Sequence, residues 1–387
     1  MHFYLYFISK IFILILFGII LLLNQNHTLF DNLKNSKDII IHTYNKTDIN
    51  NDNKKDERIK ILQKDIYQHQ IEKEIKVENI NHLLQNQSIE NKIKISISYS
   101  TDNKYIYPTI VSMISLVINA ANNTFYDIYV LHMPDFSENS KHFLNTIKDK
   151  YSDRCSIIYI NMGNKYKDLQ LNYKLSTPAY YRLSLPELLL DVKRIIYLDG
   201  DTLVFEDLKE LIELDMDGYL IMGFLDSLPN AIKSFGYKNA TVICSGVLLM
   251  DLDGIRKCGY SEKINDFISK NKNRINQHDQ TIINVVFQER IAPIPPKYGL
   301  WEAWKNKSQA KSFLKKYKHR LKYKKDELFY AIDHPAIVHF TRAKPFWKKH
   351  TNFYKEWWNY AKLTGYYNDI YYKSPIPKKF KCIKKIN

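Results

Sequence analysis

Apolar runs that end abruptly in polar residues recur through the middle of this chain. An alternating run at 95–99 ends in a polar loop, which Pro108 and an apolar-periodic stretch from Ile110 to Ala121 follow. That order predicts a strand, a loop and a helix. A short unbroken apolar run from Ile195 to Leu198 predicts a buried strand.

The same pattern continues later in the chain. It predicts an apolar strand that ends directly before His339, and a helix that opens at His278 and keeps an apolar face through Phe287. Strands that alternate with helices are typical of an α/β fold. We therefore predict a mostly parallel sheet with helices on both faces and a ligand site at the carboxyl ends of its strands.

Two aspartates lie directly after the apolar run at 195–198. Gly200 separates Asp199 from Asp201 and permits the chain to turn as it leaves the sheet. Two adjacent carboxylates repel each other, and a hard cation such as Mg²⁺ or Mn²⁺ removes that repulsion. An isolated Asp-x-Asp pair is more often a solvated turn, so the context has to decide between the two interpretations.

The context is a resemblance that extends over much of the chain. The stretch from Arg194 to Leu208 resembles the metal-binding segment of family 8 glycosyltransferases, retaining nucleotide-sugar enzymes that include bacterial lipopolysaccharide galactosyl- and glucosyltransferases and glycogenin. Further segments resemble the family's motifs in the family's order, at Ile95–Tyr105, Ser176–Leu183, Ile243–Leu252, His278–Asn284 and Ile337–Trp347. The resemblance implies a GT-A type nucleotide-sugar-binding fold, a mixed and mostly parallel sheet flanked by helices.

The resemblance also implies how the donor and a metal ion are held. Asp199, Asp201 and His339 would bind Mn²⁺ or Mg²⁺ as the cofactor. Asp102 would accept a hydrogen bond from the uracil of a UDP-sugar and Tyr105 would stack on its ring. The alternative for this last pair is an Asp that caps a helix and a Tyr that packs.

Other residues would contact the donor sugar. By the resemblance, Arg182 is a cation that helps to hold the sugar and orients the first aspartates, and Gly246 lets the backbone approach the sugar closely. Asp279 and Gln280, at a helix start, would be catalytic: Asp279 contacts the sugar and Gln280 lies near the anomeric carbon. A Gln is a poor nucleophile, so double displacement and a short-lived oxocarbenium ion both remain open.

Two departures from the family pattern bear on the donor. Cys244 occupies the usual Asn position, so one hydrogen bond to the sugar is missing or replaced by a weak thiol, and the hexose is left open. Arg342 occupies the usual Gly position, and the loop between His339 and the pyrophosphate-binding cation is one residue shorter. That cation is therefore either Lys344 or Arg342.

The amino terminus forms a separate part of the chain. Residues 1–24 are apolar enough to predict a single-pass transmembrane anchor, with a signal peptide as the alternative. Lys10 precedes the apolar core, which favours a lumenal or extracytoplasmic catalytic domain. Residues 25–92 are polar and predict a stem, residues 93–347 the GT-A domain, and residues 348–387 a basic, aromatic carboxyl-terminal extension.

Composition limits the partners of the chain. Its 387 residues carry a net charge of +16, concentrated at Lys305–Lys325 and near the carboxyl terminus. Such basic amphipathic segments suit anionic lipid head groups or an acidic acceptor, and equally a solvated helix face. Nucleic-acid binding is disfavoured because no recognised motif accompanies the charge. The four cysteines have neither metal-ligand spacing nor a disulfide pattern.

Together these features predict a metal-dependent retaining glycosyltransferase. It would move a hexose, glucose or galactose, from a UDP-sugar to a glycan or glycolipid acceptor at a membrane. Cys244 and the shortened loop after His339 raise an alternative from another class. In that alternative the chain is a membrane-tethered sugar-binding or scaffolding protein that has lost turnover.

Overall fold

The computed structural model describes residues 89–376 apart from 170–175, 227–229, 238–239 and 317–322. The predicted anchor at 1–24 and nearly all of the predicted stem at 25–92 lie outside the described residues. Among the helices that are described, none has the length and apolar character needed to cross a membrane.

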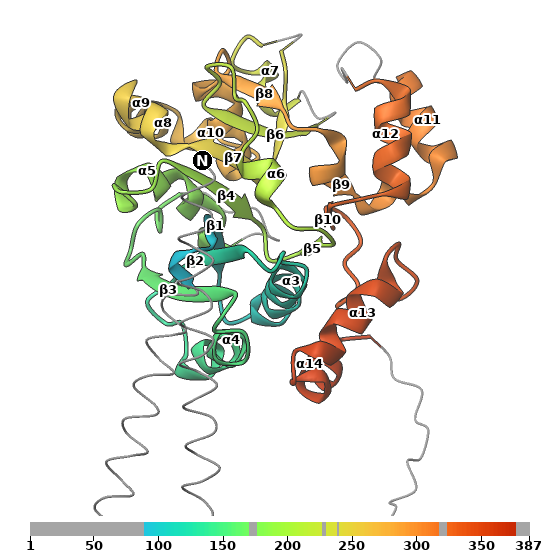
Figure 1. Cartoon of the computed structure of the whole chain (residues 1–387). Helices are drawn as coiled ribbons and strands as arrows, with labels where there is room; N and C mark the ends of the chain where they lie inside the picture. The colour runs from blue at the N-terminus through green and yellow to red at the C-terminus, as the bar shows by residue number, and fades with distance from the viewer. Residues whose placement is uncertain (1–88, 170–175, 227–229, 238–239, 317–322, 377–387) are drawn as a thin grey trace, which may run out of the picture. The chain divides into compact units, whose positions relative to one another are not determined.

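A seven-stranded sheet organises the described part of the chain (Figure 1). Its strand order is β3-β2-β1-β4-β7-β6-β8, and β7 runs antiparallel to both of its neighbours while every other pair is parallel. The predicted α/β fold with a mixed, mostly parallel sheet is therefore confirmed. The strands are β1 (Ile93–Thr101), β2 (Thr124–His132), β3 (Cys155–Asn161), β4 (Arg194–Leu198), β6 (Ile221–Leu225), β7 (Ile243–Asp251) and β8 (Ile291–Pro293).

Strand β4 shows why the sequence pattern predicts burial on both faces. Successive side chains of a strand point to opposite faces. Ile196 and Leu198 belong to one hydrophobic core and Ile195 and Tyr197 to the other, and all four are fully buried. A strand between two cores needs apolar residues at every position, which is the unbroken run seen in the sequence.

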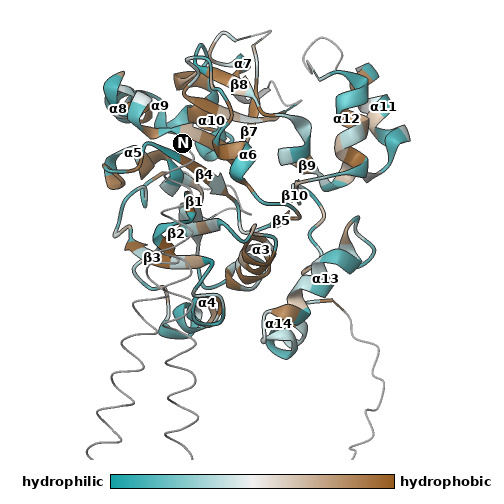
Figure 2. Ribbon diagram, in the orientation of Figure 1, coloured by the Kyte–Doolittle hydropathy of each residue, from teal (hydrophilic) through white to brown (hydrophobic). Residues whose placement is uncertain are grey.

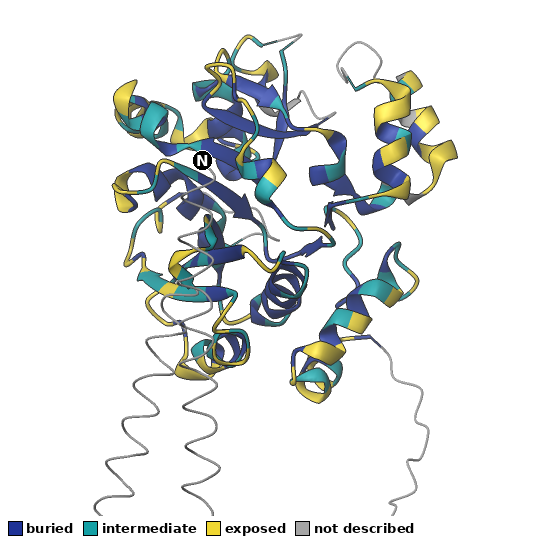
Figure 3. Cartoon of the chain, viewed as in Figure 1, coloured by how far each residue is buried: buried dark blue, intermediate teal, exposed yellow. Residues whose placement is uncertain are grey.

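Helices cover both faces of this sheet, as predicted. Helices α3 and α4 contribute to the core with Ile196, and α8, α9 and α10 to the core with Ile195. Helix α3 is hydrophobic and buried along most of its length (Figures 2 and 3). The helices on the two faces are α3 (Ile106–Ile118), α4 (Glu138–Lys150), α8 (Leu252–Lys257), α9 (Tyr260–Asn271) and α10 (His278–Val286).

Shorter helical segments connect these elements. The segment at 176–183 is helical as η1, and the α5 helix that follows it is four residues long. These segments are η1 (Thr177–Ser184), α5 (Leu185–Leu188), α6 (Lys209–Ile212), α7 (Asn230–Lys233), η2 (Lys272–Arg274), η3 (Pro296–Tyr298) and η4 (Glu302–Lys305).

A second, three-stranded sheet has the order β5-β10-β9. Its strands are β5 (Thr202–Val204), β9 (Leu300–Trp301) and β10 (Ile337–His339). Strand β5 begins directly after Asp201, and β10 pairs with it antiparallel, with His339 opposite Thr202. This pairing brings a residue from late in the chain beside the two aspartates.

The segment from residue 348, predicted as an extension of the domain, contributes to its core. Helices α13 (Tyr354–Leu363) and α14 (Tyr367–Lys373) supply Trp357 and Ile370 to the same core as α3. Asn119, at the end of α3, donates a hydrogen bond to the Tyr360 hydroxyl over 2.8 Å. The folded unit therefore continues past residue 347.

The predicted basic segment at Lys305–Lys325 leads into a pair of helices, α11 (Lys307–Lys316) and α12 (Lys325–Asp333). Figure 3 shows both helices largely exposed. Lys311 and Lys325 are exposed, whereas Ala310 and Leu328 face the core. In its described residues the segment is thus amphipathic, with Lys307 and Lys315 also exposed.

Candidate functional site

The candidate site lies where β1 and β4 end side by side. These two strands are parallel neighbours, with Tyr99 opposite Leu198, so the loops that follow them leave the same edge of the sheet. From β1 the chain adds β2 and then β3 on one side of the sheet. It then returns to add β4 on the other side of β1, so the direction of strand addition reverses between β1 and β4. A reversal of this kind is where ligands bind in open α/β sheets.

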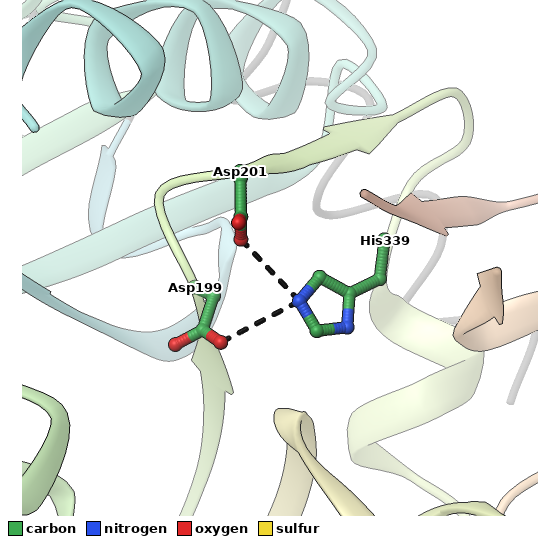
Figure 4. Close-up of side chains that lie close together, drawn as sticks. All are labelled: Asp199, Asp201 and His339. Atoms are coloured by element: carbon green, nitrogen blue, oxygen red, sulfur yellow. Dashed lines mark ion pairs between the residues drawn. The ribbon is translucent and has the colours of Figure 1, made fainter. Parts of the chain in front are cut away.

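Three potential metal ligands meet at this edge (Figure 4). Ligand atoms of Asp199, Asp201 and His339 all lie within 4.8 Å of one another. The His339 Nε2 is 3.5 Å from Asp199 Oδ2 and 3.3 Å from Asp201 Oδ1. Asp201 Oδ1 is buried and accepts no hydrogen bond from the described residues. Two carboxylates and an imidazole that converge around such an oxygen fit a divalent cation.

Two glycines make this cluster possible by leaving space. A Cβ at Gly246 would lie 2.1 Å from His339 Cε1 and 2.7 Å from Asp199 Oδ2, so the glycine accommodates the ligands themselves. The close approach predicted at Gly246 was to the donor sugar, and that contact stays a prediction. Gly200 was predicted to permit the turn, but its φ is not positive. Its Cβ would instead lie 2.3 Å from Thr109 Oγ1, so close packing on α3 requires the glycine.

Asp201 is also neutralised by the chain itself. The Lys344 ammonium contacts Asp201 Oδ2 and donates to the Phe340 carbonyl over 2.7 Å. The Tyr105 hydroxyl donates to the same Oδ2 over 2.7 Å. Burial alone would raise the pKa of Asp201, but Lys344 and His339 lower it well below its usual range. Lys344 is thus the cation that the structure places at the cluster, whereas Arg342 is exposed.

The residues predicted to bind uracil have partners within the chain. Asp102 Oδ1 accepts hydrogen bonds from the backbone N–H groups of Lys104 (2.9 Å) and Tyr105 (2.8 Å). The Tyr105 ring packs against Trp347, with ring centroids 5.2 Å apart. These are the contacts of the alternative interpretation, a capping Asp and a packing Tyr. Contact with uracil stays a prediction.

Arg182 links the metal cluster to a second group of site residues. Its Nη2 donates to Asp199 Oδ1 over 2.7 Å, and its Nε lies 3.2 Å from Asp279 Oδ2. The guanidinium is buried over the Tyr197 ring, 3.9 Å from the centroid. Arg182 therefore contacts both Asp199 and Asp279, and its contact with the donor sugar stays a prediction. Burial raises the pKa of Asp279 to about 6, although Arg182 opposes the shift.

Gln280 follows Asp279 at the start of α10. Its Nε2 donates to Asp226 Oδ2 over 2.8 Å, and its Oε1 lies 3.4 Å from the Ser245 backbone N–H. These contacts hold the amide between β7 and the end of β6. The predicted position of Asp279 and Gln280 at a helix start is confirmed, because α10 begins at His278.

Cys244, the departure from the family's Asn, lies against the metal cluster. Its Sγ is 3.7 Å from His339 Nδ1, on the side of the ring away from the aspartates. A ligating His usually has an outer partner on its second nitrogen, and here the thiol is in that place. The departure therefore bears on His339, a candidate metal ligand, and its effect on the sugar stays a prediction.

Sequence reasoning missed three residues of this site. Asp226 directly follows the buried strand β6, as Asp199 follows β4, so an apolar run that ends in Asp was a usable signal. Tyr197 donates to Asp199 Oδ1 over 3.1 Å, but in sequence it is one more apolar position of the strand. Glu302 binds the loop after His339 through its buried carboxylate. No local pattern marks it.

Comparisons with known proteins agree with this geometry. General stress protein A of Bacillus subtilis is 27% identical over 209 residues, which cover 52% of this chain and 70% of that protein. The lipopolysaccharide 1,2-glucosyltransferase of Escherichia coli is 24% identical over 263 residues, covering 66% and 73%. The chain spans smaller shares of two other curated relatives, 63% and 46% of their lengths.

A solved structure shares the fold. The structure of galactosyltransferase LgtC in complex with donor and acceptor sugar analogs matches 70% of this chain and 95% of its own, with a TM-score of 0.56 and 19% identity. That likeness supports the predicted GT-A-like fold. A family model described as glycosyl transferase family 8 matches residues 96–351, most of the described part of the chain. The chain therefore belongs to glycosyl transferase family 8 and is a transferase of glycosyl groups.

Proposed function

We propose that this chain transfers a hexose from a UDP-sugar to a carbohydrate or glycolipid acceptor, with retention of configuration and with Mn²⁺ or Mg²⁺. The observation that carries the proposal is the cluster of Asp199, Asp201 and His339 at the edge where β1 and β4 end. A divalent cation there would supply Lewis-acid stabilisation of the charge on the departing UDP. The lipopolysaccharide glucosyltransferase among the relatives supports a hexose as the donor sugar and a glycolipid as the acceptor.

The chain's own residues divide the work between the two ends of the donor. Lys344 contacts Asp201, and its flexible side chain could turn to the diphosphate where a divalent cation neutralises that carboxylate. Asp102 and Tyr105 are proposed to face the uracil. Arg182 keeps Asp199 oriented without titrating itself, because a guanidinium stays charged at all working pH values.

At the sugar, Asp279 and Gln280 are proposed to contact the hexose. The Gln280 amide is held by Asp226, so its orientation is set before a donor binds. A preoriented dipole stabilises charge that develops at the anomeric carbon better than a mobile one. Retention through a covalent intermediate and retention through an oxocarbenium ion both remain compatible with this arrangement.

The test is a donor panel. Purified protein is incubated with UDP-glucose, UDP-galactose and UDP-N-acetylglucosamine, each with Mn²⁺, with Mg²⁺ and with EDTA, and released UDP is measured. We expect metal-dependent release with one hexose preferred. Metal-dependent UDP binding without release from any donor would support the alternative, a sugar-binding protein without turnover.

The Cys244→Asn variant in the same panel addresses the choice of hexose. Restoring the family's amide adds a donor and an acceptor next to the site, and a buried polar group discriminates against a sugar hydroxyl that points the wrong way. The preference between UDP-glucose and UDP-galactose is expected to change. An unchanged preference would separate Cys244 from sugar selection.

We further propose that residues 1–24 anchor the enzyme in a membrane with the catalytic part on the extracytoplasmic side. The support is the apolar run in the sequence, long enough for a bilayer. Deletion of 1–24 should move the protein from the membrane to the soluble fraction with donor hydrolysis intact. Full-length expression that yields soluble protein lacking these residues would favour a cleaved signal peptide.

A further inference from the structure

The buried carboxylate of Glu302 binds the loop at 341–343, which lies between His339, the proposed metal ligand, and Lys344, the proposed phosphate-binding residue. Glu302, the first residue of η4, is 3% exposed. Its Oε2 accepts from the Thr341 backbone N–H (3.0 Å) and hydroxyl (3.2 Å). Its Oε1 accepts from the N–H groups of Arg342 (3.2 Å) and Ala343 (3.1 Å). Three consecutive backbone donors thus converge on one side chain.

This contact suits a carboxylate better than an amide, because both side-chain oxygens accept hydrogen bonds. Successive N–H groups that point to one place form a concave site for an anion. A carboxylate only accepts hydrogen bonds, so both of its oxygens can face donors, and several such bonds offset the cost of burying the charge. An amide of the same shape would turn an NH₂ group toward backbone N–H groups. Glu302 is therefore matched to this loop in a way that Gln is not.

The register of the small sheet explains how Glu302 reaches the loop. Strand β9 pairs parallel with β10, with Trp301 opposite His339, so Glu302 leaves β9 at the level where the loop leaves β10. We propose that Glu302 is a positioning residue that folds the loop at 341–343 so that His339 and Lys344 both reach Asp201. The inference rests on the proposed function, because it concerns the same metal and donor site.

This arrangement also determines what the loop can offer a donor. Because the three N–H groups point to Glu302, the backbone of the loop has none of them left for a diphosphate. The contact from this loop then comes from the Lys344 ammonium. The φ of Arg342 is not positive, so its backbone does not need the glycine that the family usually has there.

The experiment measures UDP binding by calorimetry with Mn²⁺ and with EDTA, and Mn²⁺ binding by electron paramagnetic resonance, for wild type and Glu302→Gln. Loss of an outer partner typically weakens metal binding by roughly 10- to 100-fold. We expect a loss of that order for Mn²⁺-dependent UDP binding and a clearly smaller loss in EDTA, where only the contact from Lys344 is weakened. Glu289→Gln, the same charge change at an exposed position outside the site, is the control and should match wild type.

A purely structural role for Glu302 predicts a different result. Partial unfolding would weaken UDP binding equally with and without Mn²⁺, and that outcome overturns the inference, as does wild-type metal-dependent affinity in Glu302→Gln. If Glu302→Gln does not fold, Thr341→Val removes one donor and leaves the carboxylate in place. It should lower Mn²⁺ affinity about threefold, because the loop loses one of the hydrogen bonds that hold it. An unchanged Mn²⁺ affinity rejects the proposal. Wild-type protein that binds no UDP would instead reject the proposed function.

Discussion

Asp201 and Asp279 are buried to a similar degree, at 6% and 4% exposed, yet their pKa values are displaced in opposite directions. Asp201 faces two cationic groups, the Lys344 ammonium and the His339 ring, and its pKa falls far below the usual range. Asp279 shares the Arg182 guanidinium with Asp199, and burial raises its pKa to about 6. Because the burial is similar, the difference lies in the neighbouring charges: Asp201 has two positive partners, whereas Asp279 shares one and also lies near the Asp199 carboxylate, which raises its pKa.

The comparison separates two parts of one site. On the metal side, the chain holds carboxylates ionised, as ligands for a divalent cation must be. On the side proposed to contact the sugar, a carboxyl group whose pKa is about 6 can accept a hydrogen bond from a hydroxyl when ionised and donate one when protonated. Arg182 touches both parts, which couples the orientation of Asp199 to that of Asp279.

The largest expected effect separates the two carboxylates directly. Asp201→Asn removes the negative charge and leaves a neutral, weaker oxygen ligand, so metal-dependent UDP binding should fall by more than the roughly 10- to 100-fold typical for loss of an outer partner. Asp279→Asn, the same change on the sugar side, should leave that binding within about threefold of wild type if only the metal side binds the cation. Calorimetric titration of UDP with and without Mn²⁺ gives both values. Equal losses of metal-dependent UDP binding in the two variants would mean that Asp201 and Asp279 do not differ in their role at the metal.

The next effect concerns Gln280, on the sugar side. Gln280→Ala should lower kcat by about 100-fold, the size of a lost electrostatic contact in the transition state, while UDP affinity stays near that of wild type. Steady-state kinetics of the preferred donor and UDP calorimetry together test this. A variant with normal turnover would exclude Gln280 from the reaction, and one with weak UDP binding would move it to the metal side.

A smaller effect is expected from Gly246→Ala. The added Cβ would lie 2.1 Å from His339 Cε1, so the ring has to move away from the aspartates. Overpacking of this kind costs about 1–3 kcal/mol, so Tm should fall together with Mn²⁺ affinity. Thermal unfolding and paramagnetic resonance of Mn²⁺ check the two readouts. Mn²⁺ binding as tight as in wild type would show that the ring can shift without loss of a ligand.

The smallest expected effect is the contribution of Asp279 to the pH dependence of the protein's stability. The folded-state pKa is about 6 and the ordinary value is 3.8, so between these values the folded protein holds a proton that the unfolded chain has lost. The contribution of Asp279 to stability is therefore complete below about pH 4 and is lost as pH rises through about 6.

Thermal unfolding of wild type and Asp279→Asn from pH 4 to pH 7 measures this contribution. The neutral Asn does not titrate, so the Tm of wild type minus that of the variant should fall across this range. A difference that is constant, or that grows with pH, would mean that Asp279 is already ionised at pH 4. In that case the contrast with Asp201 would disappear.

The local sequence pattern was enough to predict the strand and the helix start that carry the site residues. The run Ile195–Leu198 is apolar at each position because β4 lies between two cores, and the aspartates follow where the strand ends. The helix start at His278 was equally visible. The grouping of Asp199, Asp201 and His339 came from the family resemblance, and the antiparallel register of β5 and β10 is what brings them together.

Contacts between distant segments could only come from the tertiary structure. Asp102 and Tyr105 were assigned to uracil, but the sequence could not show that the Tyr105 hydroxyl reaches Asp201 or that its ring meets Trp347. The folded unit extends beyond the predicted domain end at residue 347, and no local pattern could show this. Helices α13 and α14 join the core through contacts with residues more than two hundred positions earlier, as between Tyr360 and Asn119.

The sequence by itself determined the fold class, the residue types at the sheet edge and the family to which they point. The tertiary structure decided which of those residues neutralise one another: Lys344 and not Arg342 at Asp201, Arg182 between Asp199 and Asp279, and Glu302 under the loop. The physical reason is that secondary structure follows from periodicity along the chain, whereas charge pairing depends on distances of a few ångströms between segments that only the packed fold sets.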